Sequence, residues 1–456
     1  MAGPLNGIRV VDLSTMVAGP VATMMLADQG ADVIKIESPS GDLMRHFAFG
    51  RSGMSASFLS CNRNKRSLAI DIKAPKGLEI VRKLIVTADA FVHNFRPGAA
   101  ERIGLGEGSV RSLRHDIVYV SVSGFGENGP YAGQRAYDPV IQSLSGLAEI
   151  QRDRDTGRPR MIRTIIADYT TALTTAQAIT SALFARERMG EGQHVRVAML
   201  DAMIAYLWPE AMPSLTFVGE ERDPSEGETG PDLVYATYDR YITAAALSDD
   251  EWAGMCRALN REDLIEDPRF KTARDRSVNA IERREITAAE LEKWTANEIL
   301  PRLLANDVPS APVLSRFELL KDPQVRENRI LEEHQSVRFG KVRQPRPAAQ
   351  FDRTPSAIRN LAPILGENNA DVLAQIGTTP SRLPASRAKV SYIRKQRGRN
   401  HERQSRCHRN WRWAWNGCGH RAALRARRIR CRNVGAQSRA LSRPRNRADK
   451  YEGLSM

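Results

Sequence analysis

The sequence predicts an α/β protein, with a doubly wound parallel sheet in a large domain and a smaller α+β domain after it. Apolar runs rich in β-branched residues, such as 8–13 and 31–37, alternate with helical segments such as 21–28. A short helix between two strands implies a parallel pair joined by a right-handed crossover. Repeated alternation of this kind is typical of a doubly wound sheet.

The alternation continues through the first 218 residues, which we assign to the large domain. Further strands and helices are expected at residues 67–72, 75–88, 90–95, 117–124, 137–150 and 168–189. The stretch 219–231 is polar and rich in Gly and Pro, so it is expected to be a linker.

The smaller domain is predicted at residues 232–330. A strand pair around 235–246 is followed by expected helices near 249–259, 280–286 and 288–305. Residues 331–384 return to strand and loop character and end in a helix near 368–376, and we expect them to rejoin the large domain.

The net charge of +15 over 456 residues favours a nucleic-acid partner at first, but the charge is unevenly distributed. Residues 387–456 contain 18 Arg and 3 Lys against three acidic residues, whereas residues 1–386 have a net charge of −3. Residues 385–456 are therefore predicted to be a disordered basic tail. A frame error or fusion and a polyanion-binding arm are both explanations of this tail.

Cysteine usage and the absence of apolar spans indicate the compartment. Cys61 and Cys256 are the only cysteines of the body, which fits a reducing environment. The start lacks a signal-peptide pattern and no long apolar run occurs, so we expect a cytoplasmic protein without a membrane span. The tail cysteines and histidines match no standard zinc spacing, and no metal is predicted.

Two features suggest a ligand site. The loop Ser14–Pro20 joins the first strand to the first helix, where α/β proteins bind phosphate or carboxylate groups, although a plain turn is the alternative. Asp168 is expected to begin a helix, whose partial positive charge would keep the carboxylate ionised as a nucleophile. Its alternative role is an N-cap.

Four basic residues, Lys73, Arg96, Arg102 and Arg135, follow predicted strands or precede predicted helices. A phosphate-rich ligand needs such charges, although each taken alone also fits a solvated surface.

A set of motifs occurs in a specific order over residues 1–378: Ile8-Arg-Val-Val-Asp-Leu, Gly19-Pro, Leu26-Ala-Asp-Gln-Gly-Ala-Asp-Val-Ile-Lys-Ile-Glu, Asn64-Lys-Arg-Ser, His93-Asn-Phe-Arg-Pro-Gly, Ser123-Gly-Phe-Gly, Tyr137-Asp-Pro, Ala167-Asp-Tyr and Leu365-Gly-Glu. With these motifs the chain resembles the class III CoA-transferases. That family includes formyl-CoA, carnitine-CoA and succinyl-CoA-dependent transferases, and also α-methylacyl-CoA racemase.

The resemblance implies an acyl-CoA:carboxylate CoA-transferase that works by covalent catalysis, with coenzyme A as part of its substrates. Asp168 would be the nucleophile, forming a mixed anhydride and then an aspartyl-CoA thioester. The partners would be an acyl-CoA, a carboxylic acid and a second copy of the chain in an interlocked homodimer. The implied coenzyme contacts are Met16, Ala18, Ile70, Lys73, Asn94, Phe95, Arg96, Arg102, Arg135 and Tyr137.

Two departures from the family pattern bear on function. The glycine run that closes some transferase sites is missing near Gly227-Glu-Thr-Gly-Pro. Tyr137 stands where the racemases have a proton-carrying histidine, and a phenol is a poor base at neutral pH. This difference counts against a racemase or isomerase of acyl-CoA, which is the second hypothesis. The third is nucleic-acid binding by the tail, where arginines are interleaved with Trp411, Trp413 and Trp415.

Overall fold

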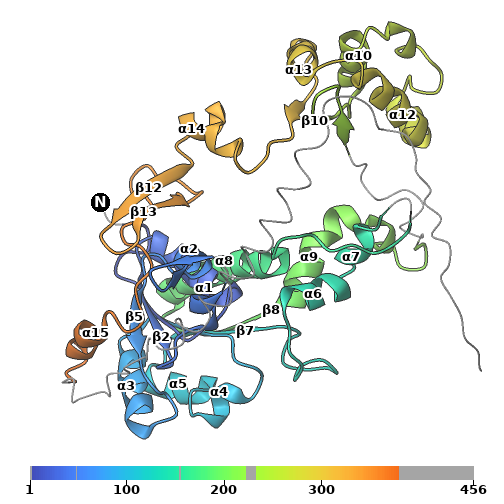
Figure 1. Ribbon diagram of the computed structural model, residues 1–456. Helices are drawn as coiled ribbons and strands as arrows, with labels where there is room; N and C mark the ends of the chain where they lie inside the picture. The colour runs from blue at the N-terminus through green and yellow to red at the C-terminus, as the bar shows by residue number, and fades with distance from the viewer. Residues whose placement is uncertain (1–2, 48, 154–155, 222–232, 379–456) are drawn as a thin grey trace, which may run out of the picture. The chain divides into compact units, whose positions relative to one another are not determined.

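The computed structural model describes residues 3–47, 49–153, 156–221 and 233–378 (Figure 1). The chain divides into two units, Met1–Pro384 and Ala385–Met456, and the second unit lies outside the described residues. The predicted basic tail and most of the predicted linker therefore also lie outside them.

A six-stranded sheet forms the centre of the large α/β part, and its strand order is β5-β2-β1-β6-β7-β8. Every neighbouring pair in this sheet is parallel, which confirms the predicted α/β class. The strands are β1 (Arg9–Asp12), β2 (Asp32–Glu37), β5 (Arg66–Ala69), β6 (Ala90–His93), β7 (Val118–Ser123) and β8 (His194–Ala198).

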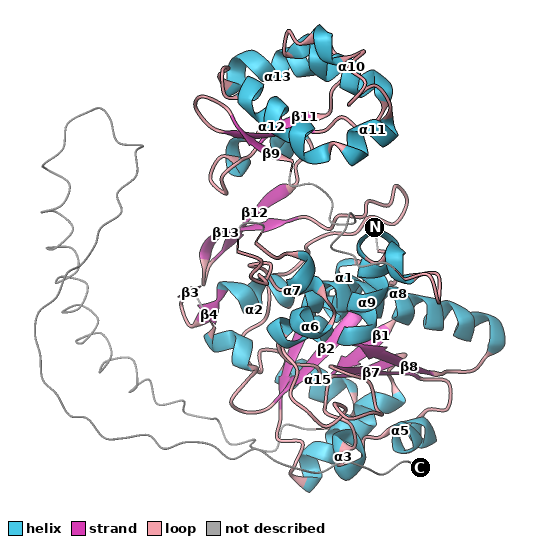
Figure 2. Ribbon diagram, turned by 90° about the vertical axis from the view of Figure 1, so that its right-hand side faces the viewer, coloured by secondary structure: helices cyan, strands magenta, loops and turns pink. Residues whose placement is uncertain are grey.

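Helices cover both faces of this sheet. Successive strand residues point to opposite faces, so Val10 lies in one apolar core and Val11 in the other. α1 (Ala18–Asp28) and α8 (Ile166–Met189) line the first core, while α3 (Pro75–Val86), α5 (Glu107–Leu113) and α15 (Asn369–Gln375) line the second. Figure 2 shows α1 and α8 on one side of the strands and α3 and α5 on the other. The other helices of this part are α2 (Ala56–Cys61), α4 (Ala99–Arg102), α6 (Asp138–Leu144), α7 (Leu147–Ile150) and α9 (Met199–Ala211).

Residues 233–312, called the 233–312 region below, have a core of their own. Three antiparallel strands, β9 (Val234–Ala236), β10 (Tyr241–Ala244) and β11 (Ser310–Pro312), pair in the order β11-β10-β9. Its helices are α10 (Asp249–Ala258), α11 (Ala273–Val278), α12 (Ala280–Leu291) and α13 (Ala296–Ala305). The exact domain boundaries at 218, 231 and 330 stay predictions.

The last described segment returns to the large sheet. It contains α14 (Pro323–Glu327) and a hairpin of β12 (Leu331–Ser336) and β13 (Gly340–Pro345); a second short hairpin, β3 (Gly50–Arg51) and β4 (Met54–Ser55), comes earlier in the chain. The Gln344 side chain donates a hydrogen bond to the Leu59 carbonyl at 3.1 Å. The Asn369 side chain accepts one from the backbone of Ala69, in edge strand β5, at 2.9 Å.

Three sequence predictions were wrong in detail. The helix predicted at 137–150 is two helices, because Gly146 has φ +86° and ends the first one. The helix predicted at 288–305 is also interrupted, since Thr295 caps a new helix, α13. Strand β8 was missed, although its alternating sequence His-Val-Arg-Val-Ala is typical of a half-buried edge strand.

Candidate active site

The order of the strands creates a crevice between β1 and β6. From β1 the chain runs outward through β2 and β5 and then returns to the opposite side of β1 to form β6. Ligands of doubly wound proteins bind at such a reversal, beyond the carboxyl ends of the strands. A cavity of about 440 Å³ lies there, lined by residues 15–18, 94–97, 122–124, Ala132, 134–137, Asp168 and Met199.

Most of the predicted site residues line this cavity. They are Met16, Ala18, Asn94, Phe95, Arg96, Arg135, Tyr137 and Asp168. These residues come from four separate stretches of the sequence, and the fold brings them together around one cavity.

Three predicted coenzyme contacts do not line the cavity. Ile70 is buried beneath the surface, and Lys73 and Arg102 are exposed outside the lining. Ile70 and Lys73 follow β5, whose carboxyl end lies at the same edge of the sheet but two strands away from β1.

Asp168 is half-buried in the first turn of α8, which begins two residues earlier than predicted, at Ile166. It is therefore not the N-cap of this helix. Asp138 of α6 takes that role from a distance, because its carboxylate accepts hydrogen bonds from the backbone N–H of Ala167 at 2.7 Å and of Asp168 at 3.3 Å.

The environment of Asp168 does not favour its ionised form as the helix-end argument had suggested. Burial raises the pKa of the Asp168 carboxyl to about 6, and the negative charge of Asp138 adds to this increase. The backbone N–H of Ala18 opposes both effects. The result is a carboxylate that is ionised at neutral pH and poorly solvated, which suits a nucleophile.

Sequence reasoning missed the supporting role of Asp138 and Gln142. The Gln142 side chain donates to Asp138 at 2.6 Å and accepts from the Ile162 N–H at 3.0 Å, so it connects α6 to the segment that leads into α8. Both residues are almost fully buried. The only sequence signal near them is the Tyr137-Asp-Pro motif, which contains Asp138, but the sequence prediction used only its tyrosine.

The predicted coenzyme residue Asn94 has a structural task as well. Its side-chain oxygen accepts from the Thr15 N–H at 2.9 Å, and its side-chain nitrogen donates to the Thr15 carbonyl at 2.8 Å. Asn94 thus fastens the loop after β6 to the loop after β1 and defines one wall of the cavity.

The cavity carries positive charge. Arg96 and Arg135 are exposed on its lining, and neither forms an ion pair with another described residue. Guanidinium groups of this kind can bind phosphates or carboxylates. Tyr137 is about half exposed beside them.

In the described ranges, no group of three or more His, Cys, Asp or Glu side chains is arranged to hold a metal ion. No helix in those ranges combines the length and the apolar character needed to cross a bilayer.

Comparisons with known proteins identify the family. The model of CoA-transferase family III matches residues 5–369. The chain is 35% identical to the succinate–glutarate CoA-transferase of Agrobacterium fabrum, covering 82% of this chain and 96% of the relative. It is 33% identical to the succinyl-CoA:mesaconate CoA-transferase of Haloarcula hispanica, covering 84% and 99%. The crystal structure of a CAIB/BAIF family protein from Brucella suis superposes with a TM-score of 0.72 at 31% identity, covering 82% of this chain and all of that one.

Proposed function

Because this chain belongs to CoA-transferase family III and is an acyl-CoA:carboxylate CoA-transferase, we propose that Asp168 is the nucleophile that carries the transferred group. The observation that supports this role is the position of Asp168. It is a poorly solvated carboxylate in the wall of the cavity at the switch point of the sheet.

The proposed reaction starts when a carboxylate oxygen of Asp168 attacks the thioester carbonyl of the donor. The carbon–sulfur bond breaks, CoA leaves as a thiolate, and a mixed anhydride remains. The thiolate then attacks the Asp168 carbonyl carbon of the anhydride, which releases the donor acid and leaves an aspartyl-CoA thioester. The acceptor carboxylate repeats these two steps in reverse and frees Asp168, so no net proton is consumed.

Each feature around Asp168 supports one part of this scheme. Burial leaves the carboxylate poorly solvated and the charge of Asp138 repels it, so the anion is less stable at rest and more ready to attack. The Ala18 N–H, which lowers the pKa of the same carboxyl group, can stabilise negative charge that develops on its oxygens. Asp138 and Gln142 keep the first turn of α8 in place.

The coenzyme is proposed to enter over the loops after β1 and β6. Met16, Ala18, Asn94 and Phe95 would contact its thiol-bearing arm, and Arg96, Arg135 and Tyr137 its polar groups. Lys73 and Arg102 are exposed outside the cavity and would contact a more distant part of the coenzyme, whereas the Ile70 side chain is buried and would not reach it.

The names of the relatives point to short dicarboxylic acids, and we propose a pair of this class as donor and acceptor acids. A matrix of acyl-CoA donors and free acids, read by mass spectrometry for exchanged thioesters, tests this. An interlocked homodimer and a cytoplasmic location are further parts of the proposal; a monomer found by sedimentation would contradict the dimer.

The nucleophile is tested by trapping the intermediate. Incubation with an acyl-CoA should add the mass of coenzyme A, less one water, to the wild-type chain, and proteolysis should place the adduct on Asp168. Asp168→Asn should show no adduct and lose at least a thousandfold in kcat. Asp28 is a buried carboxylate outside the cavity, so Asp28→Asn should still form the adduct and keep the wild-type kcat. Full activity in Asp168→Asn would exclude this residue as the nucleophile.

A further inference from the structure

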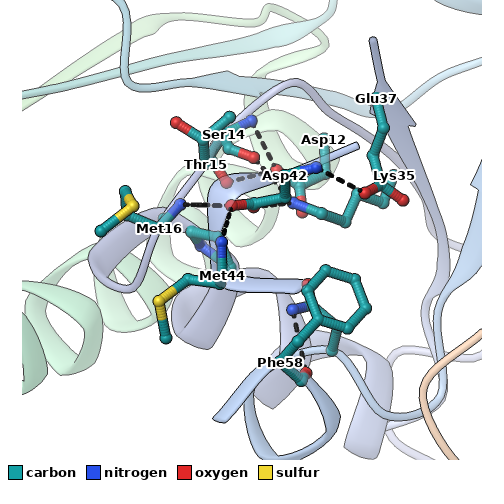
Figure 3. Close-up of polar contacts among 12 residues, drawn as sticks. Asp12, Ser14, Thr15, Met16, Lys35, Glu37, Asp42, Met44 and Phe58 are labelled. Carbon is teal, nitrogen blue, oxygen red and sulfur yellow. Dashed lines mark hydrogen bonds and ion pairs between the residues drawn. The ribbon is translucent and has the colours of Figure 1, made fainter. Parts of the chain in front are cut away.

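Three consecutive residues of the loop after β1 have their backbone groups bound by side chains from other elements. The Ser14 carbonyl accepts a hydrogen bond from Lys35 Nζ at 2.8 Å. Thr15 is held by the side chain of Asn94, and the Met16 N–H donates to both carboxylate oxygens of Asp42 at 3.3 Å. Figure 3 shows Lys35 and Asp42 next to each other at this loop.

Met16 needs such support because of its backbone conformation. Its φ is +68°, in the left-handed region. For a residue with a Cβ this region is sterically unfavourable, so the loop adopts it only where the surroundings stabilise it. Asp42 is the residue that binds the N–H of Met16 itself.

Asp42 is held in place by buried charges. Its carboxylate is 3.0 Å from Lys35 Nζ, and both side chains are fully buried. Its own N–H donates to Glu37 at 3.1 Å, and Glu37 in turn pairs with Arg45 at 2.6 Å. Because Lys35 binds the Ser14 carbonyl and Asp42 the Met16 N–H, one ion pair holds the loop on both sides of Thr15.

The loop leads directly to Ala18, the residue whose N–H acts on the Asp168 carboxyl. Ala18 is also the first residue of α1, so a change in the backbone of Met16 displaces the start of that helix. Thr15 to Ala18 all line the cavity.

We propose that Asp42 is a positioning residue for the coenzyme site, which together with Lys35 fixes residues 14–18 in the conformation that binds acyl-CoA beside Asp168. This inference rests on the proposed placement of the coenzyme over this loop. Asp42 itself lies beneath the loop, does not line the cavity and has no direct contact with the substrate in this scheme.

The test compares two Asp→Asn variants that each break a buried ion pair. Asp42→Asn removes the charge opposite Lys35. Asp28→Asn removes the charge opposite Arg63, in a 2.7 Å pair that is also buried, with 6% and 4% of the Arg63 and Asp28 side chains accessible, but that contacts no residue of the loop. Thermal unfolding, Kd for CoA by calorimetry, and KM and kcat for transfer are measured on both. Asp42→Asn should raise Kd and KM for the coenzyme at least tenfold, whereas Asp28→Asn should lower the melting temperature and change Kd less than twofold.

A second variant tests the role of the left-handed residue. Glycine adopts positive φ at almost no steric cost. The loss of CoA affinity caused by Asp42→Asn should therefore be at least threefold smaller in the Met16→Gly background than with Met16. The proposal is overturned if folded Asp42→Asn binds CoA as the wild type does, if Asp28→Asn weakens binding as much, or if the Met16→Gly background makes no difference.

These outcomes are distinct from a failure of the proposed nucleophile. If Asp168→Asn kept full activity, the assignment of Asp168 would be wrong, yet the two Kd values for CoA would still decide the role of Asp42. If Asp168→Asn is inactive and Asp42→Asn binds CoA normally, only the positioning role is lost.

Discussion

The hydrogen bonds of the helix caps in the 233–312 region and those of the loops around the cavity differ in how far apart their partners lie in the sequence. In the 233–312 region, Ser248 and Glu251 form a capping box three residues apart, as do Thr295 and Glu298. Around the cavity the partners are distant in sequence. Met16 is bound by a residue 26 positions away, Ala167 by one 29 positions away and Thr15 by one 79 positions away.

The ion pairs compared here also differ in burial. The Lys271–Glu266 pair of the 233–312 region is exposed, with 59% and 75% of the side chains accessible, whereas the Lys65–Asp12 pair below the loop is fully buried. An exposed pair contributes little because water and salt screen it. A buried pair holds its geometry strictly, because either charge left alone is costly. The loops around the cavity are therefore held by contacts that are distant in sequence. The two capping boxes of the 233–312 region are local, although this region also has long-range bonds, such as the one from the Ala296 N–H to Asp239.

The largest expected effect comes from breaking that buried pair. Lys65 Nζ binds Asp12 at 3.0 Å, the Pro20 carbonyl at 2.8 Å and Asn62 at 2.9 Å. Burial alone would raise the pKa of Asp12, but Lys65 and Lys35 lower it to about 2, so Asp12 stays ionised. Lys65→Met should therefore lower the free energy of unfolding by about 3–5 kcal/mol.

Lys271→Met is the matched control for this prediction, since it removes the same charge from an exposed pair. Its expected cost in unfolding free energy is much smaller than that of Lys65→Met, because water and salt screen an exposed pair. Urea unfolding followed by circular dichroism measures both variants, and equal costs would contradict the contrast between the two regions.

The next effect concerns pH. The Asp168 pKa is raised from its ordinary value to about 6, so the carboxyl is protonated and unreactive below that pH and ionised above it. We expect kcat/KM to fall up to tenfold per pH unit below about 6 and to be level just above it. Asp138→Asn removes the neighbouring negative charge, and the midpoint should move to lower pH because that charge helps to raise the pKa.

Asp28→Asn again serves as the control, because Asp28 lies outside the cavity and should leave the pH midpoint unchanged. A midpoint that stays constant in Asp138→Asn, with the transfer rate retained, would show that Asp138 does not influence the titration of the nucleophile.

The same contrast explains which parts of the molecule could be predicted from sequence. The parallel sheet could be, because apolar runs and short helices alternate along the chain and each is a local signal. Strand β8 was missed because it is an edge strand with only three apolar residues in five. The division between α12 and α13 was missed although Thr295 and Glu298 have the spacing of a capping box, so a local signal was available there.

The site was only partly predictable. The motifs identified the nucleophile candidate and part of the cavity lining, but not the contacts that hold them. Nothing near Asp168 in the sequence reveals that Asp138 caps its helix, or that burial raises its pKa instead of the helix end lowering it. Likewise, the link from Asp42 to Met16 depends on two loops that meet only in the folded sheet.

The smallest expected effect concerns a local contact, the capping box of α13 in the 233–312 region. Thr295 and Glu298 form a capping box at the start of α13, in which the Thr295 N–H donates to the Glu298 carboxylate at 2.9 Å and the Thr295 hydroxyl donates to the same carboxylate at 2.7 Å. Thr295→Ala should cost about 1 kcal/mol of stability and leave kcat, Kd for CoA and the pH midpoint unchanged. Asp138→Ala removes the cap of α8 instead, and it should lower kcat even at temperatures where the protein remains folded, because the first turn of that helix carries Asp168. If Thr295→Ala reduced kcat as strongly as Asp138→Ala, the 233–312 region would be coupled to the site and the separation between local and long-range support would not hold.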